Sequence, residues 1–238
     1  MVSFVKNSRA EMLSGIALAL GHEVGTSPIS LPPPFNFSRT SFSLIDLIER
    51  FKTEATQTGA RVTLVTCADD VVNYVSNLFT SVDGDGICWS NQIEKHLPTL
   101  PNLLLANRAR VVAPLTEESN LENYRKSLMD VSIGVTSADY GIANTGTLVL
   151  SSGGERHRLL SLLPPVHVCL LSATHLLSSF ADLLKTISVN APTALTCITG
   201  PSRTADIEHT VTLGVHGPRE VHVLLSLEKY NKEHLNNW

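Results

Sequence analysis

Residues 194–227 read ALTCIT (194–199), GPSRTADIEHT (200–210), VTLGVHGP (211–218) and REVHVLLSL (219–227). Two apolar, β-rich runs bracket two loops that are rich in glycine, proline and hydroxyl side chains. The first run ends where Gly200 and Pro201 follow it, because proline lacks the N–H that a strand ladder requires. The stretch therefore predicts two strands with polar loops at their ends, and we expect the functional site at these loops.

The first loop has the composition of an anion-binding turn. Ser202 or Thr204 is expected to cap a helix that begins at Ala205, with unpaired N–H groups facing the end of the preceding strand. A helix N-terminus at the carboxyl end of a parallel strand favours phosphate or carboxylate, and Arg203 can add a forked contact. A well-capped structural turn explains the same residues. On the functional interpretation, the loop supplies ligand-binding residues Gly200, Ser202, Arg203 and Thr204 and a candidate catalytic carboxylate, Asp206.

The second loop, GVHGP (214–218), places one imidazole between two glycines. Glycines let backbone approach a ligand closely, so His216 can serve as an acid, a base or a hydrogen-bond donor. A purely structural histidine in a turn is the alternative. We predict His216 as the second candidate catalytic residue.

Composition places the chain among globular α/β proteins. Of its 238 residues, 43% are hydrophobic, 17% are charged and 5% are aromatic, and the apolar content is mostly Leu, Val, Ile and Ala. The formal net charge is −4 and no basic run is dense enough for a nucleic-acid backbone. Nucleic acid is therefore excluded as a partner.

The cysteines give no sign of a metal site. Cys67, Cys88, Cys169 and Cys197 are scattered without a C-x-x-C pair, which argues against zinc or an iron–sulfur cluster in this chain. Three of them, Cys67, Cys169 and Cys197, lie in apolar runs and are predicted to be buried free thiols. Neither a signal peptide nor a membrane-spanning segment is recognisable, so a cytoplasmic location is expected.

Three regions follow from the pattern along the chain. Residues 1–40 combine a short amphipathic helix (3–20) with a proline-rich arm (21–39), residues 41–228 form the α/β domain, and residues 229–238 are a polar tail. The arm can reach across the domain or a neighbouring subunit, or lie on the surface as a linker. The domain opens with Ser41 as a cap and a helix that ends at Gly59.

Strands and helices then alternate, which predicts a mostly parallel sheet. We expect strands at 61–66, 86–90, 110–113, 131–135, 148–151 and 166–171, and helices at 69–79, 117–129 and 155–163. Thr174 is expected to cap a helix that runs to Ile187. Arg156, His157 and Arg158 are interpreted as a solvated helix face, and His167 as a core or edge histidine.

A second polar corner lies between residues 131 and 150. A single helical turn is expected at 138–143, and Thr145, Gly146 and Thr147 lead into the next strand. These three residues are predicted to bind the ligand together with the Ser202 loop. Asp139 either lines the same cleft or caps its own turn.

The familiar nucleotide, hydrolase and zinc-protease motifs are absent from the sequence, yet three segments resemble one family. Residues 134–147 (GVTSADYGIANTGT), 163–167 (LPPVH) and 198–208 (ITGPSRTADIE), followed by GVHGP (214–218), are similar to the lactate-utilisation protein C (LutC/YkgG, LUD) family. The resemblance covers about residues 41–227. It implies a Rossmann-like, mostly parallel sheet similar to the sugar-isomerase, CoA-transferase and formyltetrahydrofolate cyclo-ligase group.

The resemblance also implies a role in oxidising L-lactate to pyruvate beside partner proteins that carry iron–sulfur clusters. This chain is then expected to hold no cofactor and to bind a small organic anion or nucleotide. The sequence allows a homo-oligomer but does not determine the oligomeric state. CoA transferases of the related fold use a glutamate where this chain has Asn144, and an amide cannot form an acyl intermediate. A ligase or transferase acting on a phosphorylated, adenylated or CoA-linked acid is the alternative function, and a docking protein with structural glycine loops is a third.

Overall fold

The computed structural model describes residues 5–19, 21, 42–82, 86–97, 99–100, 102, 110–112, 120–152, 158–187, 192–204, 212–214 and 216–227. The chain divides into two compact units, residues 1–41 and 42–238. The first unit contains helix α1 (Val5–Ala19), whose apolar side chains Met12, Leu13, Ile16 and Leu18 are exposed. The proline-rich arm and the polar tail lie outside the described residues.

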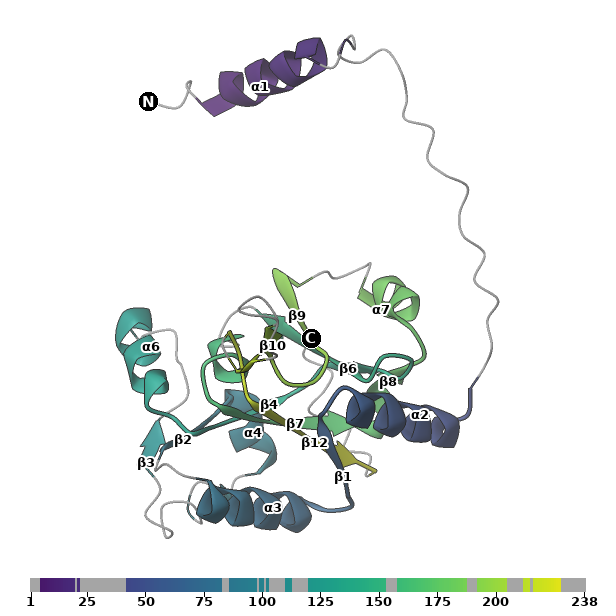
Figure 1. The fold of residues 1–238 in the computed structure, drawn as a ribbon, viewed down its shortest axis with the longest axis vertical. Helices are drawn as coiled ribbons and strands as arrows, with labels where there is room; N and C mark the ends of the chain where they lie inside the picture. Colours follow the sequence, from purple (N-terminus) through teal and green to yellow (C-terminus); the bar gives the residue numbers. More distant parts are fainter. Residues whose placement is uncertain are drawn as a thin grey trace. The chain divides into compact units, whose positions relative to one another are not determined.

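The second unit is built on a six-stranded parallel sheet with the order β1-β12-β7-β4-β2-β3. Figure 1 shows its central strands running through the middle of the unit. Its strands are β1 (Arg61–Val65), β2 (Gly86–Trp89), β3 (Arg110–Val112), β4 (Ile133–Ser137), β7 (Val166–Ser172) and β12 (Glu220–Ser226). The mostly parallel α/β sheet predicted from the sequence is thus confirmed.

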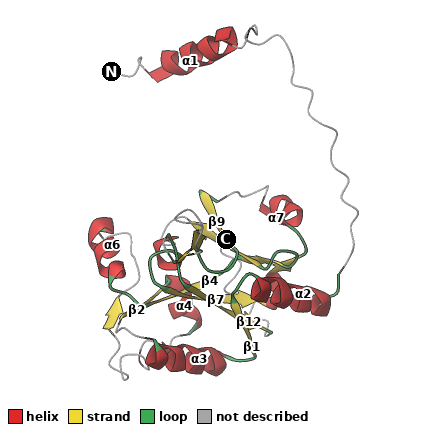
Figure 2. Ribbon diagram, in the orientation of Figure 1, coloured by secondary structure: helices red, strands yellow, loops and turns green. Residues whose placement is uncertain are grey.

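Two layers cover the sheet, with helices on one side and a mixed layer on the other (Figure 2). Helices α3 (Ala68–Ser81) and α4 (Asn91–His96) pack on the first face, where Ile133, Val135 and Val168 are fully buried. On the opposite face lie helices α2 (Leu44–Gln57), α6 (Leu121–Met129) and α7 (Phe180–Ile187), and the 3₁₀ turns η1 (Arg158–Ser161) and η2 (Ala173–His175).

The mixed layer contains a second sheet with the order β8-β5-β6-β9. Its strands are β5 (Tyr140–Ile142), β6 (Thr147–Ser152), β8 (Leu176–Leu177) and β9 (Ala194–Ile198). Strands β5, β6 and β9 pair antiparallel, and β8 runs parallel to β5. The core between the two sheets includes Phe51 and Ala55 of α2, Leu148 of β6 and Leu171 of β7.

Several local expectations are wrong. The helical turn expected at 138–143 is strand β5, because Tyr140 to Ile142 pair with β6 on one side while Gly141 and Ile142 pair with β8 on the other. Thr174 does not cap a long helix, since it lies in η2 and α7 begins at Phe180 after strand β8. In each case sheet pairing overrides a local pattern that suits a helix.

Two further expectations concern the cap of α2 and the thiols. The N-cap of α2 is Ser43, whose hydroxyl accepts from the Asp46 N–H while the Asp46 carboxylate accepts from the Ser43 N–H. Ser41 lies outside the described residues. Cys169 is buried, but the expectation for Cys197 is wrong because its residue is exposed on the edge strand β9. No described helix is both long and apolar enough to cross a lipid bilayer.

Candidate functional site

The two glycine loops of the opening stretch lie against each other. The Ser202 N–H donates to the Pro218 carbonyl oxygen at 2.9 Å, and the Gly214 N–H donates to the Ser202 carbonyl oxygen at 2.9 Å. A Cβ added at Gly217 would lie 3.1 Å from the Ser202 Cβ. The structure therefore brings Ser202 and the exposed His216 turn together, as the sequence pattern suggested.

The Ser202 loop continues as a hairpin strand. Strand β10 (Arg203–Thr204) pairs antiparallel with β11 (Thr212–Leu213). Ser202 therefore does not cap a helix, because the residue after it is already in an extended strand. Ala205 and Asp206, where the helix was expected to begin, lie outside the described residues.

Three of the predicted ligand-binding residues converge on the carboxyl end of helix α2. Gly146, with φ of 62°, packs so closely that an added Cβ would lie 2.2 Å from the Ala55 nitrogen. A Cβ on Gly200, with φ of 74°, would lie 2.5 Å from the Thr58 carbonyl oxygen. Arg203 donates from Nη2 to the same Thr58 oxygen at 2.8 Å. A helix carboxyl end attracts cations, so this position favours the Arg203 guanidinium and disfavours an anion.

The remaining members of the predicted corner form a row of hydroxyl groups. Oγ1 of Thr147 lies 2.7 Å from Oγ1 of Thr145 and 2.8 Å from Oγ1 of Thr199. Thr147 is buried, whereas Thr145 is exposed. These contacts join the start of β6 to the end of β9, and they give the buried Thr147 hydroxyl two hydrogen-bond partners.

A polar pocket lies at a different place, at the carboxyl ends of β2 and β4. Ser90, which follows β2, and Thr136 and Ser137, which end β4, line its inner wall. The chain leaves β2 toward β3 on one side and later returns to β4 on the other, so the two strands border the point where the strand order reverses. Ligands of open parallel sheets collect at such points.

The outer wall of the pocket comes from the mixed layer. Ser151 of β6, Thr196 of β9 and Arg158 of η1 line it, together with Asp139. The pocket is partly open to solvent, and its cavity volume is about 30 Å³. Oδ2 of Asp139 accepts from both the N–H and the hydroxyl of Ser151, which fixes the carboxylate at the rim. One guanidinium, one carboxylate and a set of hydroxyl groups thus face one depression.

The sequence pattern indicated only one of the charged residues that line this pocket. Asp139 was a candidate, but Arg158 was assigned to a solvated face, and no pattern singled out Thr196 or Ser90. The pocket lies at the other end of the β6–β9 pair from the predicted corner, four residues and about 13 Å along β6 from Thr147 to Ser151. The separation follows from the extended geometry of β6, which carries its first and last residues to opposite ends of the strand pair.

A buried polar cluster supports the inner wall. Nε2 of His167 on β7 lies 2.8 Å from Oγ1 of Thr136, which in turn lies 3.6 Å from Sγ of Cys169. His167 is 0% exposed and its Nδ1 has no hydrogen-bond partner among the described residues. Burial, with a smaller contribution from the charge of His222, lowers the pKa of His167 to about 3, so the imidazole is neutral at pH 7. The expectation of a core histidine is confirmed.

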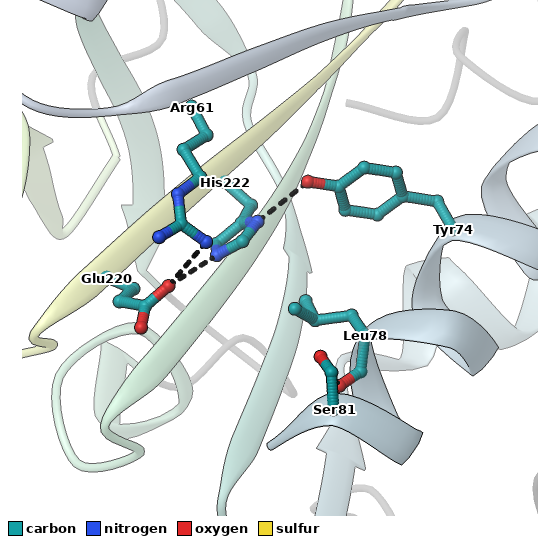
Figure 3. A network of polar contacts seen from close by, with 6 residues as sticks. All are labelled: Arg61, Tyr74, Leu78, Ser81, Glu220 and His222. Carbon is teal, nitrogen blue, oxygen red and sulfur yellow. Dashed lines mark hydrogen bonds and ion pairs between the residues drawn. The ribbon is translucent and has the colours of Figure 1, made fainter.

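A second polar network lies on the α3 face of the sheet (Figure 3). His222 of β12 bridges the Tyr74 hydroxyl at 2.7 Å and Oε2 of Glu220 at 3.2 Å, and Arg61 contacts the same oxygen at 2.8 Å. Arg61 and Glu220 begin their strands, so the network lies at the amino ends of the sheet, opposite the pocket. It joins α3 to β12 and β1.

The fold is an open α/β domain with a depression, lined mostly by polar residues, at the carboxyl edge of its parallel sheet. Residues 48–226 match the LUD domain family. Because this match spans most of the chain, the protein belongs to the LUD domain family.

Several relatives are similar to this chain. The chain is 27% identical to the protein YkgG of Escherichia coli over 230 residues, which is 89% of this chain and 95% of the relative. It is 37% identical to a lactate utilization protein C of Halalkalibacterium halodurans over 92 residues, or 36% of this chain and 40% of the relative. It is also 37% identical over 120 residues to the protein NMB1437 of Neisseria meningitidis, covering 49% of this chain and 52% of that relative. The matches thus span about half or less of two relatives and nearly all of the third.

A crystal structure of a DUF162 family protein from Deinococcus radiodurans has a similar fold. The TM-score is 0.57, the sequence identity is 18%, and the match covers 79% of this chain and all of the other. At this identity the likeness concerns the fold alone.

Proposed function

We propose that this protein is a cluster-free component of an L-lactate utilisation system and that it binds a small organic anion in the pocket at the β2–β4 edge. Membership of the LUD family and relatives named lactate utilization protein C support the role. The partners are proteins that carry the iron–sulfur clusters for electron transfer. Within this proposal, this chain binds the acid.

The presence of both Arg158 and Asp139 in the lining of one pocket, among hydroxyl groups, supports the ligand class. A guanidinium offers two parallel donors that match a carboxylate, and no described carboxylate forms an ion pair with Arg158. Asp139, held by Ser151, accepts a hydrogen bond from a hydroxyl group. A 2-hydroxy acid satisfies both ends, with its carboxylate at Arg158 and its hydroxyl at Asp139.

The experiment replaces Arg158 in cells. A strain that lacks this gene is complemented with the wild-type chain, with Arg158→Ala and with Arg125→Ala, and growth on L-lactate is compared with growth on glucose. Arg125 is an exposed arginine of α6 outside the pocket and serves as the matched control. Loss of lactate growth with Arg158→Ala alone supports the proposal. Full growth with Arg158→Ala contradicts the pocket assignment, and full growth without the gene contradicts the role.

The predicted surface around Ser202 and His216 is the competing location. His216→Ala and Arg203→Ala are tested in the same strain, and a growth defect confined to these two variants, with normal protein levels, moves the site there. ATP and CoA are included as ligands of the purified chain. Tight binding of either, in place of lactate, favours the ligase or transferase alternative.

A further inference from the structure

Donor and acceptor can be assigned for each hydrogen bond around Thr136. Burial raises the pKa of the Cys169 thiol to about 12, so the thiol keeps its proton, and its Sγ lies 3.7 Å from the Leu170 carbonyl oxygen. A carbonyl oxygen only accepts, so the thiol hydrogen points to Leu170 and the sulfur is left as an acceptor. The Thr136 hydroxyl, 3.6 Å away, is then the donor to this sulfur.

This direction decides the tautomer of His167. If Thr136 uses its hydrogen toward Cys169, its oxygen must accept from Nε2 of His167, which therefore carries the imidazole hydrogen. Nδ1, which has no partner among the described residues, is then a bare lone pair. The opposite tautomer buries an N–H without an acceptor, and orphaned N–H groups are rarer in proteins than under-satisfied acceptors.

We propose that His167 is a positioning residue that fixes the Thr136 hydroxyl as a hydrogen-bond donor, and that this donor selects an anionic acceptor oxygen in the pocket. The inference rests on the proposed function, because Thr136 lines the pocket assigned there to the organic anion. The Thr136 hydrogen has only a long contact to a thiol sulfur, which is a weak acceptor. A carboxylate oxygen is a far better acceptor, and accepting from His167 polarises the Thr136 O–H further.

The chemical class of ligand follows from the two donors together. Arg158 and Thr136 both line the pocket and both carry donor groups. A carboxylate that reaches between them has an acceptor oxygen for each, and it replaces the Cys169 sulfur as the acceptor of the Thr136 hydrogen. An amide of the same size has an NH₂ group where the carboxylate has its second oxygen. When this NH₂ group faces the Thr136 or Arg158 donor, neither group finds an acceptor. The pocket is therefore expected to prefer L-lactate or pyruvate over lactamide.

The tautomer is tested on the full-length ligand-free chain by ¹⁵N NMR. The imidazole signals of His167 are assigned by their loss in His167→Gln, or by their shift in Thr136→Val if the glutamine variant does not fold. The expected result is a protonated Nε2 and an unprotonated Nδ1, with the Nε2 signal moving in Thr136→Val and unmoved in Thr63→Val, a matched change on β1. A protonated Nδ1, or a Thr136→Val spectrum identical to the wild type, overturns the proposal.

The selectivity is tested by calorimetry with L-lactate, pyruvate and lactamide. Thr136→Val is expected to weaken L-lactate binding about tenfold, the effect of one charge-assisted hydrogen bond, with Thr63→Val unchanged. His167→Gln retains an N–H donor to Thr136, and it is therefore expected to keep more of the wild-type affinity for L-lactate than His167→Leu. Equal affinity of Thr136→Val and wild type, or a preference for lactamide, overturns the proposal. If the wild type binds no acid, the proposed function fails, while the NMR result still decides the tautomer.

Discussion

Arg203 donates from Nη2 to the carbonyl oxygen of Thr58, 2.8 Å away, at the carboxyl end of helix α2. This contact joins a residue of the hairpin strand β10 to the last turn of a helix 145 positions earlier in the chain. A guanidinium in this place satisfies a helix-end carbonyl group and interacts favourably with the negative end of the helix dipole. It gives Arg203 a structural role that its loop composition did not reveal.

Replacing Arg203 with alanine is expected to lower the free energy of unfolding by about 1 kcal/mol, because the side chain is exposed and solvent screens the contact. Urea unfolding followed by circular dichroism measures the change, with Arg125→Ala as the control. A variant that keeps full stability and yet loses affinity for L-lactate contradicts the structural role and makes Arg203 a ligand contact.

Gly146 is expected to tolerate no side chain. The substitution Gly146→Ala combines a φ of 62° with a Cβ only 2.2 Å from the Ala55 nitrogen, so we expect a loss of about 3 kcal/mol or more. Gly15→Ala is the control, since nothing lies within 4 Å of its added Cβ and alanine favours the helix α1 in which it lies. Equal unfolding midpoints for the two variants would show that the corner does not pack against α2.

Two buried histidines make stability depend on pH. Burial lowers the pKa of His167 to about 3, and burial also lowers the pKa of His222, against the opposing effect of its contact with Glu220. Because the unfolded chain takes up a proton near pH 6.5 and the folded chain does so only at lower pH, the stabilisation is complete above about pH 6.5 and is lost as the pH falls. Below pH 6.5 each histidine contributes a slope of up to about 1.4 kcal/mol per pH unit.

Thermal melts between pH 7.5 and 5 are expected to show this fall, and His222→Asn is expected to flatten it. His216→Asn is the control for histidine number, because His216 is exposed and lies outside both buried clusters. A melting temperature that is constant over this range, or that rises toward pH 5, contradicts the burial of the two imidazoles.

Thiol labelling is expected to separate the four cysteines by burial. Cys197 is exposed and Cys67 is partly exposed, whereas Cys88 and Cys169 are buried, with burial raising the pKa of their thiols to about 11 and about 12. An aromatic disulfide reagent at pH 8 should label two thiols in the native chain and four in guanidinium chloride. Labelling of Cys169 at the rate of Cys197 would contradict the packing behind the pocket.

Alternation of apolar runs predicted the sheet, because parallel strands buried on both faces, such as β7 and β12, read as continuous hydrophobic stretches. The predictions that were wrong concern short segments that form strands only because they pair with neighbouring strands. The sequence predicted a turn at Tyr140 to Ile142 and a helix at Leu176 and Leu177. In the structure these segments are strands β5 and β8, which pair with each other in the second sheet. Neither segment shows this pairing by its own residues.

The sequence predicted the kinds of side chain in the candidate site better than the position of the site in the fold. The sequence indicated that Ser202 and His216 lie together, and their loops are hydrogen-bonded through Gly214 and Pro218. It indicated Asp139 as a possible lining residue, which the pocket contains. Arg158 could not be assigned, because an arginine beside Arg156 and His157 looks like any solvated face until η1 places it opposite Asp139.

The binding of L-lactate to the purified full-length chain, followed by isothermal calorimetry, tests the central claim most directly. We expect the wild type, Arg125→Ala and His216→Ala to bind alike, and Arg158→Ala to bind about ten- to a hundredfold more weakly, as loss of a charge-assisted contact requires. Unchanged affinity in Arg158→Ala, or loss of affinity in His216→Ala alone, would contradict a carboxylate site at the β2–β4 edge.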